Sequence, residues 1–382
     1  MEFESSHGKI QFVRGQTLPV PTRSSQAETQ PILQATESPE RANIVALLTY
    51  KRAPPMKAVW YEELGPADDV MKTGKIDTPE AGSGEVRVKL AASGVNPADV
   101  KRRGLGTYGL EHPRIIPNSD GAGIVDQIGD GVSPDLLGQR VWLFNGQRGG
   151  RAFGTAAEYI ALDAWLVAPL PDDLSFAEGA CLGIPCMTAH HNVFSDGPVD
   201  EKTVLVTGGA GAVGHYTVQW ARRGGATVIA TVSSDTKAEY AKAGGAHHTV
   251  NYRDPDAATQ ILDLTHGAGV DRIVEVDLAA NLDITSTVIK SGGTISVYAS
   301  TGDPKNLMLR MALRNARLRF MVLHSVPRDA IDHARSDIAV WLAEGSAIHS
   351  VAAIFPLADC AEAHKFVEGG SKLGTVVVES GK

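Results

Sequence analysis

Apolar residues recur along the chain with two different periods. From Met56 to about residue 180, short stretches in which every second residue is apolar are separated by Gly and Pro, which is typical of β-strands and turns. From about residue 202 to 299, apolar stretches of strand length alternate with segments of helical period. We expect strands there at 203–208, 227–232, 247–251, 270–277 and 293–299. The pattern predicts an α/β chain, with a β-rich unit of barrel type followed by a parallel sheet with crossover helices.

The two ends of the chain follow other patterns. Residues 1–55 are rich in Gln, Ser, Thr, Pro and Glu and show no sustained period, so we expect a mostly disordered extension. After residue 299 strands and helices alternate again. The predicted elements are a strand within 317–325, a helix near 328–343, a strand near 348–355, a helix over 357–368 and a strand over 373–379.

Composition limits the classes of function that remain open. The formal net charge of -8 and the pI near 5.8 argue against a nucleic-acid partner, since such surfaces carry a basic excess. No apolar run approaches the roughly 18 residues needed to span a bilayer. Cys181, Cys186 and Cys360 lack CxxC spacing, so we expect neither a disulfide framework nor a multi-cysteine zinc loop. We therefore expect a cytoplasmic protein without a membrane segment.

A glycine cluster follows the first strand of the parallel-sheet part. In "VLVTGGAGAVGHYTVQW" (204–220), Gly209, Gly211 and Gly214 form the pattern GxGxxG between a predicted strand and a predicted helix. The first glycine permits a tight turn, the second lets the backbone approach a pyrophosphate, and the third allows close packing of helix on strand. Backbone N–H groups, including those of Ala212 and Val213, then face the phosphates. We predict a dinucleotide site here; the alternative is a glycine turn that serves packing alone.

The end of the second strand indicates which dinucleotide binds. An Asp or Glu there would bind the ribose 2′-hydroxyl of NAD, but this strand ends in uncharged residues, with Ser233 after it. Lys237 follows in the next turn, and Tyr252 and Arg253 follow the third strand. These donors suit a 2′-phosphate. Asp235 lies close by, and we interpret it as a helix cap rather than a ribose ligand. The sequence thus favours NADPH.

Several longer stretches carry a family resemblance. They are "SGVNPADVKRRG" (93–104), "NSDGAGIVDQIGDGV" (118–132), "GIPCMTAHHNV" (183–193), the glycine stretch (204–222) and "GGAHHTVNYRD" (244–254). Through them the chain from Met56 to its C-terminus resembles the medium-chain dehydrogenase/reductase superfamily and, within it, the zinc-free quinone oxidoreductase branch that includes zeta-crystallin.

The resemblance implies a fold and a division of the chain. The expected fold class is α/β, with a GroES-like β-barrel catalytic domain plus a Rossmann domain that contains a doubly wound parallel sheet, and with the active site at their junction. The expected divisions are the extension 1–55, the first part of the catalytic domain 56–180, the NADPH-binding domain 181–325 and the return to the catalytic domain 326–382.

The positions of the catalytic zinc ligands in related dehydrogenases carry other residues here. Asn96 stands where a cysteine would be, Asn118, Ser119 and Asp120 stand where Gly-His-Glu would be, and Ile184 occupies the second cysteine position. Tetrahedral zinc is bound by sulfur and nitrogen ligands, which Asn, Ser and Ile do not supply. We therefore predict no catalytic zinc.

The resemblance also implies site residues. Asn96 would bind the substrate carbonyl or the nicotinamide ribose. Asp99 would lie near the substrate or, as the equally weighted alternative, act as a cap for the short helix expected over 98–104. Tyr108 matches a substrate-lining aromatic residue in a glycine-rich loop. Thr188 matches a threonine beside the nicotinamide, and Lys372 matches a residue of a C-terminal stretch near the cofactor.

The implied activity is hydride transfer from NADPH to a quinone or to the β-carbon of an activated enone, without zinc. A lysine stands at position 101, where this branch usually has tyrosine, so the identity of the substrate stays open. Two alternatives remain: an alkenal or enoyl reductase or a metal-free alcohol dehydrogenase, and a non-catalytic NADPH-binding structural or redox-sensing protein. Short-chain dehydrogenases are excluded, because no tyrosine in the sequence is followed four positions later by lysine.

Three further features are interpreted from the residues. The pairs His190–His191 and His247–His248 are adjacent, so they point to different sides of an element, and we expect structural or surface roles. The Gly- and Arg-rich loop 144–155 is either a flap over the site or an ordinary solvated loop. The apolar runs "TISVYAS" and "FMVLHSV" offer a sheet edge through which we expect a homodimer to form.

Overall fold

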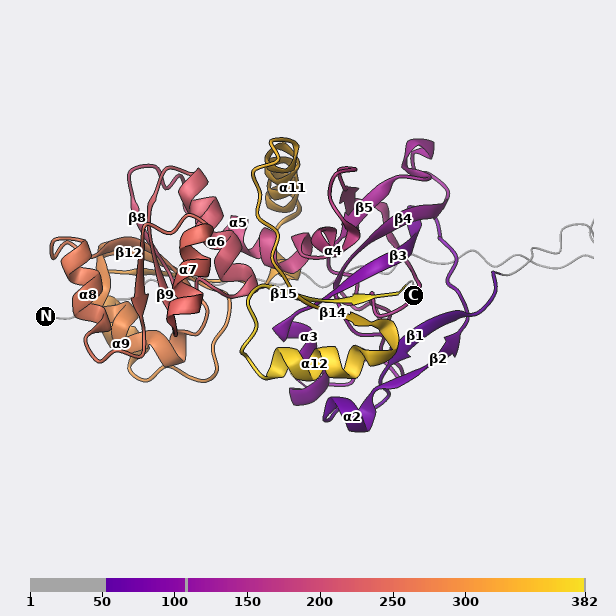
Figure 1. The fold of residues 1–382 in the computed structure, drawn as a ribbon, viewed down its shortest axis with the longest axis horizontal. Helices are drawn as coiled ribbons and strands as arrows, with labels where there is room; N and C mark the ends of the chain where they lie inside the picture. Colours follow the sequence, from indigo (N-terminus) through magenta and orange to yellow (C-terminus); the bar gives the residue numbers. More distant parts are fainter. Residues whose placement is uncertain (1–52, 107–108, 381–382) are drawn as a thin grey trace, which may run out of the picture. The chain divides into compact units, whose positions relative to one another are not determined.

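The computed structural model describes residues 53–106 and 109–380, and the strands of this part form three sheets (Figure 1). The first is a small antiparallel pair. It consists of β1 (Met56–Trp60) and β2 (Lys72–Ile76), between which the chain forms the short helix α2 (Ala67–Val70). Of the extension predicted at 1–55, residues 1–52 lie outside the described part of the chain.

The second sheet combines strands from distant parts of the sequence. Its order is β14-β15-β3-β4-β5-β7, and β6 pairs with β3 outside this path. The bounds are β3 (Glu85–Val95), β4 (Asp120–Ile128), β5 (Arg140–Leu143), β6 (Tyr159–Asp163), β7 (Val167–Pro169), β14 (Val351–Pro356) and β15 (Thr375–Glu379). The C-terminal strand β15 pairs antiparallel with β3, for example Val376 with Val95. Much of β3 is buried at alternate positions, as the period-2 pattern predicted.

Helices complete this half of the described chain. Helix α3 (Pro97–Leu105) begins directly after β3, and α12 (Cys360–Glu368) packs against α3, β14 and β15. The shorter elements are η1 (Pro134–Leu136), η2 (Ala164–Leu166), α4 (Phe176–Gly179) and η5 (Leu357–Asp359). Buried side chains of β1, α12 and β15 share an apolar core with Val95 and Val100. The C-terminal residues are therefore part of the structure that holds the end of β3.

The third sheet is parallel and has six strands in the order β10-β9-β8-β11-β12-β13. The bounds are β8 (Thr203–Val206), β9 (Thr227–Val232), β10 (His248–Asn251), β11 (Val270–Glu275), β12 (Ile289–Val297) and β13 (Arg317–Phe320). Counted along the chain this is the order 3-2-1-4-5-6 of a doubly wound nucleotide-binding sheet. The predicted fold class is confirmed, and five predicted strands fall on β8 to β12.

Crossover helices join these strands. They are α6 (Ala212–Arg223), α7 (Asp235–Ala243), α8 (Ala257–Leu264), α9 (Leu278–Val288) and α10 (Leu307–Leu313). Figure 1 shows α6 and α7 beside β8 and β9. Helices α8 and α9 are labelled in the same half of the picture. Apolar residues on the inner faces of β8, β9, β11 and β12 are fully buried with those of α8 and α9, which explains their near-continuous apolar sequences.

Two segments connect the β-rich part with the parallel sheet. The first is η3 (Leu182–Cys186), continued by α5 (Met187–Phe194); the second is η4 (Leu323–Ser325), followed by α11 (Arg328–Ala343). Helix α5 packs against both α6 and α11. Trp220 and Trp341 meet in this region with ring centroids 4.4 Å apart, next to Phe194. Within residues 53–106 and 109–380, no helix has the length and apolar character needed to cross a membrane.

Candidate functional site

The glycine turn lies between β8 and the start of α6, where the sequence predicted it. A Cβ on Gly209 would lie 2.7 Å from the Cβ of Ala230, and one on Gly214 would lie 2.1 Å from the carbonyl oxygen of Gly208. These two glycines are required for packing. A Cβ on Gly211 would meet its nearest neighbour, the same carbonyl oxygen, at 3.4 Å. Internal packing therefore does not require glycine at position 211. The space next to this residue is open, and a bound pyrophosphate would need that space.

Buried hydrogen bonds fix the position of this turn. The hydroxyl of Thr207 donates to Oε1 of Glu275 (2.9 Å), and the N–H groups of Gly208 and Gly209 donate to the hydroxyl and carbonyl oxygens of Thr231 (3.1 and 3.0 Å). The first N–H groups of α6, from Ala212 onwards, have no acceptor in a preceding turn of the helix. They remain available to a phosphate at the positive end of the helix.

The C-terminal part of the chain meets the glycine turn. Gly211 and Gly374 form an isolated parallel β-bridge, and the Nζ atom of Lys372 donates to the carbonyl oxygen of Gly374 (2.7 Å). Burial lowers the pKa of Lys372 to about 8. The structure thus places Lys372 beside the turn, although 161 positions separate residues 211 and 372.

The residues predicted to bind a 2′-phosphate lie at the ends of β9 and β10. The N–H of Tyr252 donates to the carbonyl oxygen of Val232 (3.0 Å), which brings Tyr252 next to Ser233. Lys237 lies in the first turn of α7. Among the described residues its ammonium group has no hydrogen-bond or ion-pair partner, so it remains available to a ligand.

One expectation at this place is wrong. The cap of α7 is Ser234, whose hydroxyl accepts from the N–H of Lys237 (3.4 Å), and Asp235 is the first residue of the helix. Serine adopts the extended backbone of a cap and accepts the free N–H, while a carboxylate in the first turn stabilises the helix dipole. Asp235 is therefore not the cap of α7 but its first residue, where it stabilises the helix.

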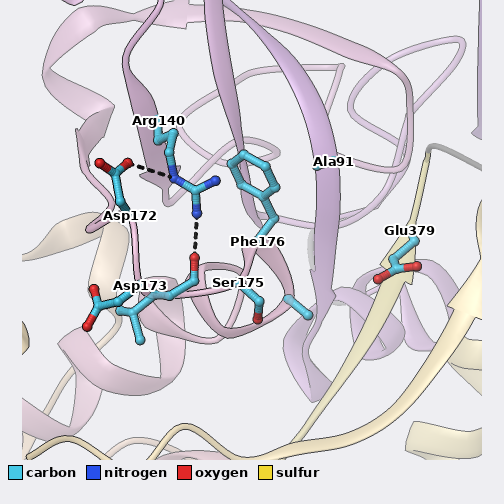
Figure 2. A pocket seen from close by; sticks show the side chains of 9 residues that line it. Ala91, Arg140, Asp172, Asp173, Ser175, Phe176 and Glu379 are labelled. Carbon is cyan, nitrogen blue, oxygen red and sulfur yellow. Dashed lines mark hydrogen bonds and ion pairs between the residues drawn. The ribbon is translucent and has the colours of Figure 1, made fainter. Parts of the chain in front are cut away.

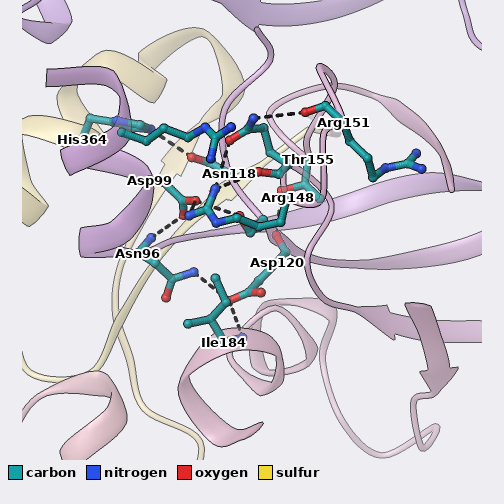
Figure 3. Close-up of polar contacts among 12 residues, drawn as sticks. Asn96, Asp99, Asn118, Asp120, Arg148, Arg151, Thr155, Ile184 and His364 are labelled. Atoms are coloured by element: carbon teal, nitrogen blue, oxygen red, sulfur yellow. Dashed lines mark hydrogen bonds and ion pairs between the residues drawn. The ribbon is translucent and has the colours of Figure 1, made fainter. Parts of the chain in front are cut away.

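Asn96 and Asp99 form the first turn of α3. The N–H of Asn96 donates to Oδ2 of Asp99 (2.9 Å), while Oδ1 accepts from the hydroxyl of Ser119 (2.8 Å) and from Nη2 of Arg148 (2.9 Å; Figure 3). The Asp99 side chain is fully buried and the Arg148 side chain is 5 % exposed. Three donors therefore occupy the carboxylate, and the capping alternative for Asp99 is the one that the contacts support.

Asp120, the first residue of β4, holds the side chain of Asn96. Its Oδ2 accepts from Nδ2 of Asn96 (2.7 Å) and from the N–H of Ile184 (2.9 Å). Oδ1 is buried without a hydrogen-bond partner among the described residues. Burial, with the nearby Asp99 carboxylate as the second cause, raises the pKa of Asp120 to about 8. A Cβ on Gly183 would lie 2.1 Å from Oδ1, so glycine is needed where η3 passes this carboxyl group.

A buried polar chain supports this end of the site (Figure 3). Oδ1 of Asn118 lies 2.9 Å from Nε2 of His364, and its Nδ2 donates to the hydroxyl of Ser93 (3.0 Å). Ser93 contacts Thr155 (2.7 Å), whose hydroxyl lies 2.7 Å from the backbone oxygen of Asp120. Burial lowers the pKa of His364 to about 4, so its imidazole is neutral at pH 7.

The donors gathered here do not fit catalytic zinc. Asn96 and Ser119 face carboxylates through hydrogen bonds, and at Ile184 the backbone N–H, a donor, points to Asp120. Zinc in proteins is bound by thiolate, imidazole or carboxylate groups. The carboxyl groups of Asp99 and Asp120 are close to Asn96, but among the described residues no set of three such groups converges here. The arrangement instead holds one amide in a defined orientation.

Three further expectations concern the loops and α5. Tyr108 lies outside the described residues. Thr188 is the second residue of α5 and is 4 % exposed, and its carbonyl oxygen accepts from Nδ2 of Asn192 (2.7 Å). The first half of the loop 144–155 is not a solvated loop, because residues 144–148 are buried and Nη2 of Arg148 donates to Asp99.

A surface hollow of about 600 Å³ lies elsewhere (Figure 2). The guanidinium of its Arg140 stacks 4.1 Å above the ring of Phe176, approaches Asp172 at 3.6 Å and donates to the backbone oxygen of Leu174. It shares no residue with the glycine turn or with the cluster around Asp120. The guanidinium is already paired with Asp172 and with a backbone oxygen, and the hollow lies away from the glycine turn, so it is not the candidate site.

Four residues near the site had no predicted role in it: Arg148, Asp120, His364 and Glu275. Asp120 carried a signal, because a carboxylate follows two polar residues at the start of an apolar strand. Arg148 stood in a Gly-rich loop, and His364 stands on a helix 246 positions after its partner Asn118. Nothing local indicates such pairings.

Comparisons with known proteins agree with this geometry. Residues 82–172 match the alcohol dehydrogenase GroES-like domain, and residues 212–332 match the family described as zinc-binding dehydrogenase. The chain is 31 % identical to a 2-haloacrylate reductase of Burkholderia sp over 338 residues, covering 85 % of this chain and 98 % of that protein. It is 29 % identical to the quinone oxidoreductase of Rattus norvegicus over 332 residues, covering 85 % and 97 %.

Solved structures give the same result. A mycobacterial protein in complex with NADPH superimposes with a TM-score of 0.77 at 29 % identity, over 85 % of this chain and 100 % of that one. The doubly wound sheet, the GxGxxG turn and the residues at the zinc positions are those expected from the resemblance. The chain therefore belongs to the medium-chain dehydrogenase/reductase superfamily, in its zinc-free quinone oxidoreductase branch, and is an oxidoreductase.

Proposed function

We propose that this protein reduces quinones, or small molecules with an activated carbon–carbon double bond, with NADPH and without zinc. One observation carries the proposal: an open glycine turn coexists with an amide, Asn96, held by a buried carboxyl group where metal-dependent relatives bind zinc. The relatives named quinone oxidoreductase and 2-haloacrylate reductase support this substrate class.

The turn and the strand ends would hold the cofactor. N–H groups at Ala212 and Val213 would bind the pyrophosphate next to Gly211, whose own N–H donates to the carbonyl oxygen of Gly208 (2.9 Å). Lys237 and Tyr252 would bind the 2′-phosphate. When bound, NADPH supplies the hydride. Hydride transfer requires the nicotinamide and the acceptor to be held in register, which is the contribution of the protein.

The contact with Asp120 determines what Asn96 offers. Because Nδ2 donates to Oδ2 of Asp120, the carbonyl oxygen of the Asn96 amide faces away from that carboxyl group (Figure 3). This amide oxygen accepts hydrogen bonds, so it suits a ribose hydroxyl, which donates, better than a substrate carbonyl, which only accepts. Of the two roles expected for Asn96, the structure therefore favours positioning of the nicotinamide ribose. A quinone product takes its proton from water, so no dedicated acid is needed.

A reductase acting on carbon–carbon double bonds is the second candidate. It is favoured by the similarity to the 2-haloacrylate reductase, which extends over 98 % of that protein. Such a substrate accepts hydride at the β-carbon and a proton at the α-carbon. The neutral carboxyl group of Asp120 stays buried behind Asn96, so this proton would come from water.

Steady-state oxidation of NADPH tests the proposal. Turnover is compared on 1,4-benzoquinone, 9,10-phenanthrenequinone, 2-chloroacrylate and an alkenal, with NADH in parallel and with and without a chelator. We expect turnover that prefers NADPH and resists the chelator. Turnover restricted to 2-chloroacrylate and the alkenal would favour the second candidate. Tight NADPH binding without turnover on any acceptor would instead indicate the non-catalytic alternative.

We also propose that the protein is a cytoplasmic homodimer. The three cysteines are buried free thiols, which suits a reducing compartment. Of the two apolar runs considered for the dimer, "TISVYAS" lies mostly in β12, which pairs with β11 and β13 and is not an edge. β13 is one of the two edge strands of this sheet, the other being β10. Exposed apolar side chains gather on β13 and on α10, namely Met308, Leu309, Leu313 and Phe320.

A further inference from the structure

Three potential metal ligands meet between the two segments that connect the sheets. Nε2 of His190 lies 2.7 Å from Oδ2 of Asp337, and Nε2 of His333 lies 3.5 Å from the same oxygen. One ligand atom from each residue lies within 4.8 Å of the others. His190 belongs to α5, whereas His333 and Asp337 stand one turn apart on α11.

Packing holds the buried member of this cluster in place. The His190 side chain is 3 % exposed, and its ring lies 5.0 Å from the centroids of both Phe194 and Trp220. Its ring nitrogen therefore points to Asp337 in an orientation fixed by aromatic neighbours. The other two side chains are accessible, with Asp337 39 % and His333 69 % exposed. An ion can reach the cluster from solvent without opening the protein.

We propose that His190, His333 and Asp337 bind a divalent transition-metal ion of the zinc type. Two imidazoles and one carboxylate are a ligand set that zinc uses, with water completing a tetrahedral site. Bonds of about 2.1 Å place the ligand atoms of a tetrahedron about 3.4 Å apart. The separation of His333 and Asp337 matches this spacing, and the His190–Asp337 hydrogen bond opens by about 0.7 Å when a metal replaces its proton.

The spacing along the sequence also favours such a site. Residues at positions i and i+4 of a helix lie on the same face, so His333 and Asp337 present their ligand atoms together. His190 faces them from the neighbouring helix α5, which packs on α11. The ion would therefore bridge the first and second connections between the β-rich part and the parallel sheet. The cluster shares no residue with the glycine turn or with the residues around Asp120.

Metal binding to the full chain tests the proposal. After chelator treatment, the protein is titrated with Zn²⁺ by calorimetry, and its Tm is measured with Zn²⁺ or Mg²⁺. Co²⁺ is added separately, since its visible absorption reports a tetrahedral site with nitrogen and oxygen ligands. The variant His333→Ala removes an exposed ligand without disturbing the core. His248→Ala, at an exposed histidine on β10, is the matched control.

We expect one Zn²⁺ per chain, a Tm raised by about 4 °C at a hundredfold excess over Kd, and no response to Mg²⁺, which prefers oxygen ligands. His333→Ala should weaken zinc binding at least tenfold and abolish the tetrahedral Co²⁺ spectrum, while His248→Ala leaves both unchanged. Zinc binding of equal strength in His333→Ala and the unmodified protein would overturn the proposal, as would the absence of any binding.

Discussion

Gly211 and Gly214 differ in the reason each is glycine, although both belong to one motif. At Gly214 a side chain would enter the carbonyl group of Gly208 at 2.1 Å, so the fold itself excludes it. At Gly211 a methyl group fits at 3.4 Å, and the backbone angles of φ -77° and ψ 168° are allowed to any residue. Folding therefore does not require glycine at 211, and we propose that a bound pyrophosphate does.

The two glycines should therefore respond differently to replacement by alanine. Gly211→Ala should leave the Tm of the free protein within about 1 °C of the unmodified value but raise the Kd for NADPH at least tenfold, because the methyl group occupies the place of the pyrophosphate. Gly214→Ala should lower the Tm and the affinity together. Thermal unfolding and fluorescence titration with NADPH measure both. Unchanged NADPH binding in Gly211→Ala would remove the main support for a pyrophosphate on this turn.

Asp120 is a buried carboxyl group whose protonation depends on folding. Its pKa rises from an ordinary value of 3.8 to about 8 in the folded protein. At a pH between these two pKa values, Asp120 carries a proton in the folded chain but has released it in the unfolded chain. Asp120 therefore lowers stability as the pH rises from about 4 to about 8, by up to about 1.4 kcal/mol per pH unit.

The variant Asp120→Asn tests this pH dependence. The amide keeps the shape of the neutral carboxyl group and does not ionise, so the stability of the variant relative to the unmodified protein should rise from pH 5 to pH 8. Urea unfolding at four pH values gives the difference. Asp172→Asn, whose side chain is 98 % exposed, is the control and should show a nearly constant difference. A difference for Asp120→Asn that is equally constant would contradict the raised pKa.

At the scale of elements, we propose that the ends of β9 and β10 set the preference between NADPH and NADH. The backbone bond from Tyr252 to Val232 aligns the two strand ends, and capping by Ser234 places Lys237 in the first turn of α7. An ammonium group without a partner in the described part of the chain gains most from a phosphate. The strand end contains no carboxylate that would repel one, since Asp235 lies inside the helix.

Replacing this lysine should change the preference. We expect Lys237→Ala to raise the KM for NADPH about 10- to 100-fold, because one charge-assisted hydrogen bond to the 2′-phosphate is lost. The KM for NADH, which lacks this phosphate, should change little. Lys242→Ala, on the same helix but paired with Glu239, is the control. An equal effect on both cofactors would show that Lys237 acts on the fold and not on the 2′-phosphate.

The sequence predicted those elements whose signals are local. The glycine turn, the six strands and helix 328–343 follow from period and from glycine spacing, and they are found within a few residues of the expected bounds. The cap of α7 was misplaced by one residue because Ser234 and Asp235 are both good caps. The pairs Asp99–Arg148 and Asn118–His364 join residues 49 and 246 positions apart. Their contacts depend on the tertiary fold, so no local pattern contains them.

At the scale of the whole molecule, the parallel sheet has a free edge. Strand β13 pairs with β12 on one side, and within the described chain nothing pairs with its other side. Exposed apolar edges lead to aggregation unless another chain covers them. Phe320 is 64 % exposed at the end of β13, and Leu313 on the preceding helix is 76 % exposed. A two-fold axis along this edge would pair β13 with its copy and bury these side chains together.

The variant Phe320→Lys should therefore dissociate the dimer, because it places a charge where an apolar side chain would be buried twice, once in each copy. Light scattering should give a mass near 81 kDa for the unmodified protein, twice the 40.4 kDa of the chain, and a mass near that of one chain for the variant. Leu137→Lys, at a residue 53 % exposed in the β-rich part, should remain dimeric. A monomeric mass for the unmodified protein would mean that β13 is left uncovered, and its aggregation on concentration should then exceed that of Phe320→Lys.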